Sequence, residues 1–382
     1  MKWSALAVVL VATLSLSACG KKPDTAAEGK QIIRIGQSSP LTGPQAHLGK
    51  DNDNGARLAI DEINAAKPTL GGKPVVFELM SEDDGADPKI ATTVAQRLVD
   101  EGVVGVIGHL NSGATIPASK VYSDAGIPQV SPSATAVKYT TQGFKTAFRV
   151  MTNDAQQGKV LGAYAAKLGK KIAIIDDRTA YGQGLADEVE KAAKAAGEEV
   201  VAREYTTDRA SDFMAILTSI KAKNPDVVFF GGMDPQAAPL VKQMRQLGMK
   251  ARFLGADGSE TPKFIELAGP DAEGSIASMP GLPLEGMPGG QSFKQKFEAK
   301  YGQIQNYAPY AYDAARVMVE AMKRANSAEP AKYLAELPKT DFQGVTGHIR
   351  FDARGDLAGG AITLYQVKDG KWTVLETVKS AE

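Results

Sequence analysis

Cysteine and histidine are both scarce in this sequence. The one cysteine among 382 residues is Cys19, so no disulfide can form within the chain. The three histidines, His47, His109 and His348, lie far apart and have none of the spacings that metal ligands share. We therefore expect no metal site.

An excess of charge of either sign is also lacking. The 44 lysine and arginine residues balance 44 aspartate and glutamate residues. This balance gives no electrostatic reason to expect binding to nucleic acid or to an anionic membrane surface. The composition, 43% hydrophobic and 23% charged, is that of a globular protein. The chain is long enough to form two domains, each with its own hydrophobic core.

The motifs of common enzyme classes are missing as well. Neither G-x-S-x-G nor H-E-x-x-H occurs, and these patterns mark serine hydrolases and zinc proteases. Gly43, Gly49 and Lys50 resemble part of a phosphate-binding loop, but five residues separate the glycines and Asp51 would repel a phosphate. The Tyr181–Gly184 turn does not complete a dinucleotide-binding pattern. We expect a protein that is not an enzyme and has no cofactor.

A long hydrophobic run is absent, but a short one occupies the N-terminus. Lys2 is followed by an apolar stretch over residues 5–12, and Leu16-Ser17-Ala18-Cys19 resembles the lipobox of bacterial lipoproteins. We interpret residues 1–18 as a signal peptide, Cys19 as the lipidation site and the polar residues 19–31 as a flexible tether. An ordinary signal peptide or an uncleaved membrane anchor are the alternatives. The protein is then exported and anchored by lipid on the periplasmic side of a bacterial membrane.

Strands and helices alternate through most of the remaining chain. This order predicts an α/β fold with two lobes, each built on a doubly wound parallel sheet. The pattern restarts near residue 151, and the last segments again look like strands, so we expect a hinge with several crossovers. The predicted lobes are residues 32–150 plus 280–355 and residues 151–279 plus 356–382.

Polar residues follow the predicted strands where an open α/β sheet binds ligands, beyond the carboxyl ends of its strands. Ser112 follows the strand Val103–Gly108 at a predicted helix N-terminus, which attracts anions. Ser133 and Thr135 follow the next strand, and Asp257 follows the strand Ala251–Ala256. Uncharged donors on one lobe and a carboxylate on the other suit a zwitterion. The alternatives are that Ser112 and Thr135 only cap helices, that Asp257 is a surface acid and that Tyr181 only packs.

Several segments together resemble the branched-chain amino-acid (Leu/Ile/Val) binding proteins of bacterial ABC transporters, with the type I periplasmic binding fold, here in a lipoprotein form. The segments run in order through nearly all of the mature chain. They are Ile35-Gly36 with Pro40–Gly43, Asp83-Asp84 with Asp87-Pro88, Val106–Leu110, Ser131–Thr135, Tyr181–Gly184 and Gly255–Gly258.

The resemblance implies a role for individual residues. Ser112, Ser133, Ala134 and Thr135 match positions that bind the ligand carboxylate, and Asp257 with Thr135 match positions that bind its ammonium group. Tyr181 matches a tyrosine that closes over the ligand. Leu48, Met233 and Tyr312, with Tyr310 as the alternative to Tyr312, match the remaining pocket positions. This chain departs from the family pattern at Leu48 and Met233. These departures affect the part of the pocket that selects the side chain.

The resemblance also implies a function and partners. We expect a monomer that captures a branched-chain or other apolar α-amino acid between its lobes and delivers it to an inner-membrane ABC permease. No cofactor, metal or nucleic acid takes part. The alternative is a binding protein that senses another amino acid or a small amide.

Overall fold

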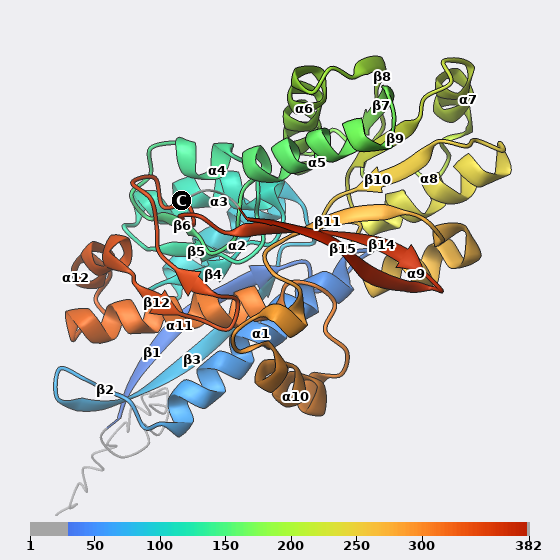
Figure 1. Cartoon of the computed structure of the whole chain (residues 1–382). Helices are drawn as coiled ribbons and strands as arrows, with labels where there is room; N and C mark the ends of the chain where they lie inside the picture. Colours follow the sequence, from blue (N-terminus) through green and yellow to red (C-terminus); the bar gives the residue numbers. More distant parts are fainter. Residues whose placement is uncertain (1–29, 380–382) are drawn as a thin grey trace, which may run out of the picture.

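The structure is a computed structural model that describes residues 30–379. The predicted cleavage point and Cys19 lie outside the described residues. Residue 31, which the sequence analysis assigns to the tether, begins the first strand. Figure 1 shows two lobes, with the blue and cyan elements in one and the green and yellow elements in the other. In the described part of the chain, no helix is both long and apolar enough to span a membrane.

The first lobe contains a six-stranded sheet with the order β2-β3-β1-β4-β5-β6. Its strands are parallel except for the short antiparallel pair β2–β3. β4, β5 and β6 are buried along their whole length, as strands between two helix layers should be, and the polar side chains of Gln129, Ser131 and Arg149 are buried with them. The strands are β1 (Gln31–Ser39), β2 (Thr69–Leu70), β3 (Lys73–Asp83), β4 (Val106–Gly108), β5 (Gln129–Ser131) and β6 (Ala147–Arg149).

Helices cover both faces of this sheet. α1 and α11 pack together on one face with β1, and α2 and α3 pack on the other face around Leu98, Val106 and Tyr122. The helices of this lobe are α1 (Ala46–Ala65), α2 (Pro88–Asp100), α3 (Ser112–Asp124), α4 (Lys138–Thr141), α10 (Gly290–Tyr301), α11 (Ala308–Ala325) and α12 (Pro330–Tyr333). Short 3₁₀ turns η2 (Leu284–Gly286) and η3 (Leu334–Lys339) and the small hairpin β12 (Phe342–Gln343) and β13 (His348–Ile349) complete it.

The second lobe contains a seven-stranded sheet with the order β15-β14-β11-β10-β9-β7-β8. β14 and β15 join it antiparallel, so this sheet is mixed, whereas its other strands are parallel. The strands are β7 (Lys171–Asp176), β8 (Glu199–Tyr205), β9 (Val227–Gly231), β10 (Arg252–Gly255), β11 (Ile276–Pro280), β14 (Ala361–Lys368) and β15 (Lys371–Lys379).

Two helix layers enclose this sheet too. α5 and α6 pack closely together on one face, and α7, α8 and α9 pack on the other around Phe253 and Phe264. The helices are α5 (Asp154–Leu168), α6 (Ala180–Ala195), α7 (Met214–Ala222), α8 (Asp234–Gln246) and α9 (Pro262–Ala268), followed by the turn η1 (Gly269–Ala272).

Side-chain caps fix where several of these helices begin. Asn153 and Gln156 form a reciprocal capping box at the start of α5. Thr179 accepts a hydrogen bond from the Gly182 N–H at the start of α6, and Thr261 does the same for Phe264 in α9. Each cap satisfies a backbone donor that has no partner inside the helix.

The chain crosses between the lobes after β6, after β11 and before β14. A buried ion pair joins two of these crossings, because Arg149 at the end of β6 contacts Asp356. Asp356 also accepts hydrogen bonds from Thr140 (2.8 Å) and from the Asn153 side chain (3.1 Å). The same guanidinium donates to the carbonyls of Ala134 and Ala136. The hinge is therefore tied to the loop that the sequence analysis assigns to the ligand.

Several elements differ from the sequence-based expectation. The first helix begins at Ala46 and not at Asp53, because the buried residues Leu48, Gly49 and Asn52 extend it toward the cleft. α9 and β11 were not predicted, and they are only seven and five residues long. Such short segments give too few repeats for a helix or strand period to be recognised.

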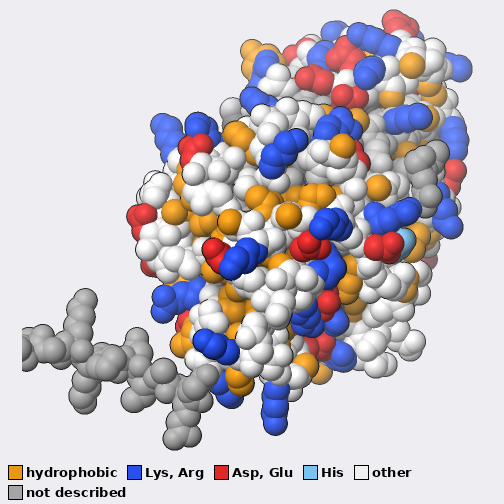
Figure 2. All heavy atoms as spheres, turned by 90° about the vertical axis from the view of Figure 1, so that its left-hand side faces the viewer, with side chains coloured by type: hydrophobic (Ala, Val, Ile, Leu, Met, Phe, Trp, Pro, Cys, Tyr) orange, Lys and Arg blue, Asp and Glu red, His pale blue; other side chains and the backbone are white. Residues whose placement is uncertain are grey.

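The surface agrees with the balanced composition. Figure 2 shows acidic and basic side chains interspersed over one face of the molecule, with no broad area of a single sign. This arrangement matches the absence of net charge.

Candidate functional site

The first wall of the cleft is the turn after β4. His109 is fully buried there, with Nδ1 2.7 Å from Asp84 Oδ2 and Nε2 3.0 Å from the Tyr122 hydroxyl. These contacts fix the turn that presents Leu110, Asn111 and Ser112 to the cleft. Asn111, not Ser112, is the N-cap of α3. Ser112 is the first helical residue, where backbone N–H groups have no partner inside the helix and the helix dipole is positive.

The loop after β5 lies beside this helix start. The Ser112 hydroxyl accepts a hydrogen bond from the Ala136 N–H (3.1 Å), which joins the two loops. The Ser133 hydroxyl donates to the Leu110 carbonyl (3.3 Å) and accepts from the Asn52 side chain (3.0 Å). Ser112 and Ser133 therefore form one small polar wall without any charge.

Thr135 and Ala134 lie behind this wall. Both are buried and neither lines the cavity between the lobes. The Thr135 carbonyl accepts a hydrogen bond from the backbone N–H of Asp154 (2.9 Å), the first residue of α5. Burial raises the pKa of Asp154 to about 8, and the nearby Asp257 charge adds to the increase while Thr135 opposes it. Thr135 thus joins the hinge helix to the polar wall.

Asp257 forms the opposite wall, after β10 in the second lobe. Its Oδ1 accepts hydrogen bonds from the Tyr181 hydroxyl (2.8 Å) and from Gln157 Nε2 (2.9 Å). Its Oδ2 accepts one from the Tyr307 hydroxyl (2.8 Å). Burial raises the pKa of Asp257, and these three hydrogen bonds oppose the increase. Burial and the Asp257 charge also raise the pKa of Tyr181 and Tyr307 well above 10, so both hydroxyls remain donors.

The two walls meet around a small internal cavity of about 10 Å³, which is room for roughly one water molecule. The lobes are thus closed on each other, and a larger ligand enters only when they separate. The cavity is lined from both lobes, by Leu110, Asn111, Ser112, Ser133, Tyr181, Met233, Asp257 and Tyr307.

The structure does not bring every predicted residue to this cavity. Leu48 is fully buried in the core and does not line it. The placement of Tyr312 in the pocket is wrong: its hydroxyl donates to Glu62 Oε2 (2.5 Å) and its ring meets Phe293 edge-on. Tyr312 lies in the second turn of α11, on a different face from Tyr307, which precedes that helix. Met233, the N-cap residue of α8, does line the cavity.

Tyr307 and Gln157 both donate hydrogen bonds to the Asp257 carboxylate, and neither was predicted from the sequence. Tyr307 could have been predicted, because it lies directly before the predicted helix Ala308–Ala325. Ser112 was predicted from the same kind of position, at the start of a helix. Asp51 in α1 positions this segment: its Oδ2 accepts from the N–H groups of Asn306, Tyr307 and Ala308, at 2.7–2.9 Å. Gln157 had no comparable signal, because a polar residue within a helix usually faces solvent.

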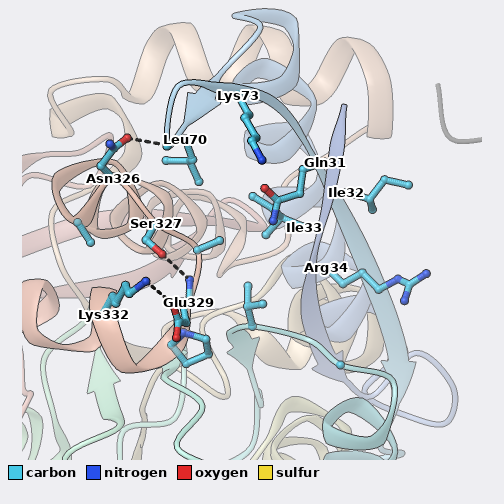
Figure 3. Close-up of a pocket in the computed structure, with 16 residues that line it drawn as sticks. Gln31, Ile32, Ile33, Arg34, Leu70, Lys73, Asn326, Ser327, Glu329 and Lys332 are labelled. Atoms are coloured by element: carbon cyan, nitrogen blue, oxygen red, sulfur yellow. Dashed lines mark hydrogen bonds and ion pairs between the residues drawn. The ribbon is translucent and has the colours of Figure 1, made fainter. Parts of the chain in front are cut away.

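A larger hollow lies elsewhere in the described part of the chain. It has a volume of about 810 Å³ and is lined only by the first lobe, at the amino end of β1. Figure 3 shows Gln31, Ile33 and Arg34 along one side and Ser327, Glu329 and Lys332 along the other. Lys332 is already paired with Glu329 (2.6 Å). Ligands of open α/β sheets bind at the carboxyl ends of the strands, so this hollow is not the candidate site.

The chain belongs to the periplasmic binding protein family, which matches residues 32–371. The fold is the type I periplasmic binding protein fold.

Relatives with known names cover almost the whole chain. A Leu/Ile/Val-binding protein homolog 1 from Brucella suis is 36% identical over 90% of this chain and 93% of its own length. A leucine-, isoleucine-, valine-, threonine- and alanine-binding protein from Pseudomonas aeruginosa is 35% identical over 87% of this chain and 89% of its own.

A solved structure has the same fold. The branched-chain amino acid transporter substrate-binding protein LivJ from Streptococcus pneumoniae, in complex with isoleucine, is 30% identical, with a TM-score of 0.82. The alignment covers 92% of this chain and 100% of that one. A leucine-binding protein from Thermotoga maritima aligns with a TM-score of 0.83 and 28% identity, over 91% and 98% of the two chains.

Proposed function

We propose that this protein is the extracytoplasmic substrate-binding component of an ABC importer and that it captures a branched-chain or similar apolar α-amino acid. One observation carries the proposal: uncharged donors on one lobe face a carboxylate on the other, across a cavity that both lobes line. An α-amino acid has the complementary carboxylate and ammonium groups. The names of the relatives support the ligand class.

The binding sequence follows from the positions of these groups. The ligand carboxylate binds first at the N-terminus of α3, to N–H groups near Ser112 and to the Ser112 and Ser133 hydroxyls. Closure of the second lobe then brings Asp257 to the ammonium group. An ionised carboxylate has about four acceptor positions, and three of those on Asp257 are occupied by Gln157, Tyr181 and Tyr307. The remaining position, on Oδ2, is free for the ammonium group.

The side-chain pocket decides which amino acid is preferred. Met233 and Leu110 are its apolar members at the cavity, and methionine adapts to different shapes. Burial of an aliphatic side chain contributes about 1.5–3 kcal/mol, and hydrogen bonds to charged groups contribute about the same each. Part of this offsets the ordering of the ligand and the lobes, so we expect a dissociation constant in the micromolar range or below.

Isothermal titration calorimetry tests the ligand class. Leucine, isoleucine, valine, phenylalanine and alanine are titrated under identical conditions, with γ-aminobutyrate as a ligand whose charges are further apart. We expect leucine, isoleucine or valine to bind most tightly. Absence of heat with every α-amino acid contradicts the proposal.

The cellular position is part of the proposal. A cleaved signal peptide, residues 1–18, and a lipid on Cys19 would keep the protein at the membrane surface where an inner-membrane permease recognises the closed form. The support is the sequence Leu16-Ser17-Ala18-Cys19. Palmitate labelling of the Cys19→Ser variant in cells should be lost, and labelling that persists in this variant would overturn the assignment. A monomer suffices, because both walls of the site come from one chain.

A further inference from the structure

A second cavity lies between the lobes, on the far side of the segment that carries Tyr307. Asn306 lines this second cavity and donates to the Asp257 carbonyl (2.8 Å), while Tyr307 lines the first. The second cavity has a volume of about 390 Å³. Its lining includes residues of α9 in the second lobe and of α10 in the first, two helices that are labelled in Figure 1.

Both lobes contribute walls to this cavity. Ile265 of α9 and Tyr365 of β14 belong to the second lobe, and Leu284, Met287 and Tyr310 belong to the first. Closure of the lobes therefore completes the cavity and opening disassembles it. An occupant that touches both sides has a higher affinity for the closed form.

Glu260 is the unusual group in this cavity. It ends the loop after β10, three residues beyond Asp257, and its backbone N–H donates to the Ala256 carbonyl (3.1 Å). Within residues 30–379, its carboxyl group has neither a hydrogen-bond partner nor an ion partner. Burial raises the pKa of Glu260 to about 8, and the nearby charge of Asp257 adds to the effect. A partly buried carboxyl group without a counter-charge is costly in its ionised form, so Glu260 holds a proton at neutral pH unless a cation replaces it.

The surroundings of Glu260 suit an organic cation. The rings of Tyr310, Tyr365 and Trp372 line the cavity together with Met279 and Leu282. Aromatic rings and a carboxylate attract an ammonium group, and apolar side chains bind the hydrocarbon attached to it. The Tyr310 hydroxyl is already bonded to the Pro280 carbonyl (2.5 Å), so this ring presents its apolar part rather than a free donor.

Other charged groups at the cavity do not neutralise Glu260. Lys294 lies 3.8 Å from Glu285 and is thus paired with it. Lys371 is exposed at the start of β15, and the described residues include no ion pair between it and Glu260. Glu298 adds a third carboxylate to the lining. The charge that the cavity lacks is therefore positive.

We propose that this cavity is a second ligand site, which binds a small aliphatic amine through an ion pair with Glu260 and apolar contacts with Met279, Leu282 and Met287. The site stands independently of the amino-acid site. Its coupling to that site rests on the function proposed above. Because residues of both lobes line the cavity, the amine stabilises the closed form and increases the affinity for leucine. Leucine then increases the affinity for the amine by the same factor.

Calorimetry with n-pentylamine as the probe tests the site. The full chain with leucine at saturation is titrated with n-pentylamine at several pH values, with 1-pentanol as the uncharged isostere. We expect n-pentylamine to bind and 1-pentanol not to bind. Because the amine displaces the proton of Glu260, its affinity should rise about 10-fold per pH unit up to pH 8 and level off above it. Binding at pH 7 should release up to one proton, measured from the dependence of the heat on the buffer.

Three variants separate this site from the amino-acid site. Glu260→Gln should abolish n-pentylamine binding. Without amine, its affinity for leucine should stay within about 2-fold of that of the unchanged protein. Thermal unfolding followed by circular dichroism checks that the variant is folded. Glu285→Gln, at the same cavity but paired with Lys294, should change amine affinity by less than about 3-fold. Unchanged n-pentylamine binding in Glu260→Gln overturns the site. Loss of amine binding in Asp257→Asn but not in Glu260→Gln also overturns it, because the amine then occupies the amino-acid cavity.

The coupling has its own readout. Leucine affinity measured with n-pentylamine at saturation should increase by at least about 5-fold, and Glu260→Gln should remove the increase. If n-pentylamine binds at Glu260 and leucine affinity stays the same, the coupling is wrong. If leucine does not bind at all while n-pentylamine does, the proposed amino-acid function fails and the amine site stands.

Discussion

Tyr307 is the residue that joins the first lobe to the Asp257 carboxylate. Its hydroxyl donates to Asp257 Oδ2 across the cleft (2.8 Å), on the same oxygen that has an acceptor position free for a ligand ammonium group. Gln157 and Tyr181 hold the other oxygen from within the second lobe. The orientation of Asp257 in the closed form therefore depends on a donor from each lobe.

Tyr307→Phe tests this role against a matched control. The variant keeps the ring and loses a hydrogen bond to a charged group, which contributes about 1.5–3 kcal/mol. We expect leucine affinity to fall at least 10-fold, measured by calorimetry. Tyr312→Phe removes the hydroxyl that is bonded to Glu62 instead and should leave the affinity within about 2-fold. Equal effects of the two variants would contradict the assignment.

Residues at strand ends could be predicted from the sequence, and residues brought in by helix packing could not. Ser112, Ser133, Tyr181 and Asp257 all reach the cavity, because parallel strands align their carboxyl ends at one edge of a sheet. Tyr307 arrives through the packing of α11 on α1, which sequence periodicity does not specify. Tyr312 follows it by five residues, which turns it roughly 140° further around the helix axis.

At the scale of elements, α1 positions the start of α11. A Cβ at Gly55 of α1 would lie 2.3 Å from the Ala308 carbonyl oxygen, so only glycine allows this close approach. Asp51, one turn earlier, accepts the N–H groups that precede and begin α11. Burial raises the pKa of Asp51, and these backbone hydrogen bonds oppose the increase. The contact between α1 and α11 thus sets the position of Tyr307.

Asp51→Ala should therefore reduce stability and binding together. Several backbone donors would lose their acceptor, at about 1–3 kcal/mol for each buried donor left unsatisfied. We expect a lower free energy of unfolding in urea and a leucine affinity reduced at least 10-fold. Asp61→Asn, on the same helix, removes only a half-exposed pair with Lys300. Such pairs contribute little, so this control should resemble the unchanged protein in both measurements.

The sheet order shows how far the fold follows from the sequence. The alternation of strands and helices predicted two sheets with helices on both faces, and the family comparison supports that architecture. The edge of the second sheet was less predictable, because β11 is short and ends in Pro280. Its antiparallel pairing with β14 is a long-range contact that returns the chain to the second lobe.

At the scale of the whole molecule, the two lobes are held closed by contacts on both sides of the cleft. His47 of α1 lies 2.8 Å from the buried Asp234 at the start of α8. Tyr307 and Asn306 contact Asp257 on the other side. These contacts form only when the lobes meet, so they favour closure in addition to any ligand. A ligand then shifts the equilibrium by its own preference for the closed form.

The clamp for both ends of a zwitterion is the central claim, and calorimetry with ligand analogues tests it most directly. Leucine and 4-methylpentanoate, which lacks the ammonium group, are titrated into the unchanged protein and into Asp257→Asn. 3-Methylbutylamine, which lacks the carboxylate, is titrated into Glu260→Gln, so that the proposed amine site does not contribute. We predict that leucine binds the unchanged protein at least 10-fold more tightly than 4-methylpentanoate does, and at least 10-fold more tightly than 3-methylbutylamine binds Glu260→Gln. Asp257→Asn should weaken leucine by about 2 kcal/mol, or roughly 30-fold, and alter 4-methylpentanoate by less than about 3-fold. Equal leucine affinity in the two proteins would contradict the account, because the ammonium group would then bind elsewhere.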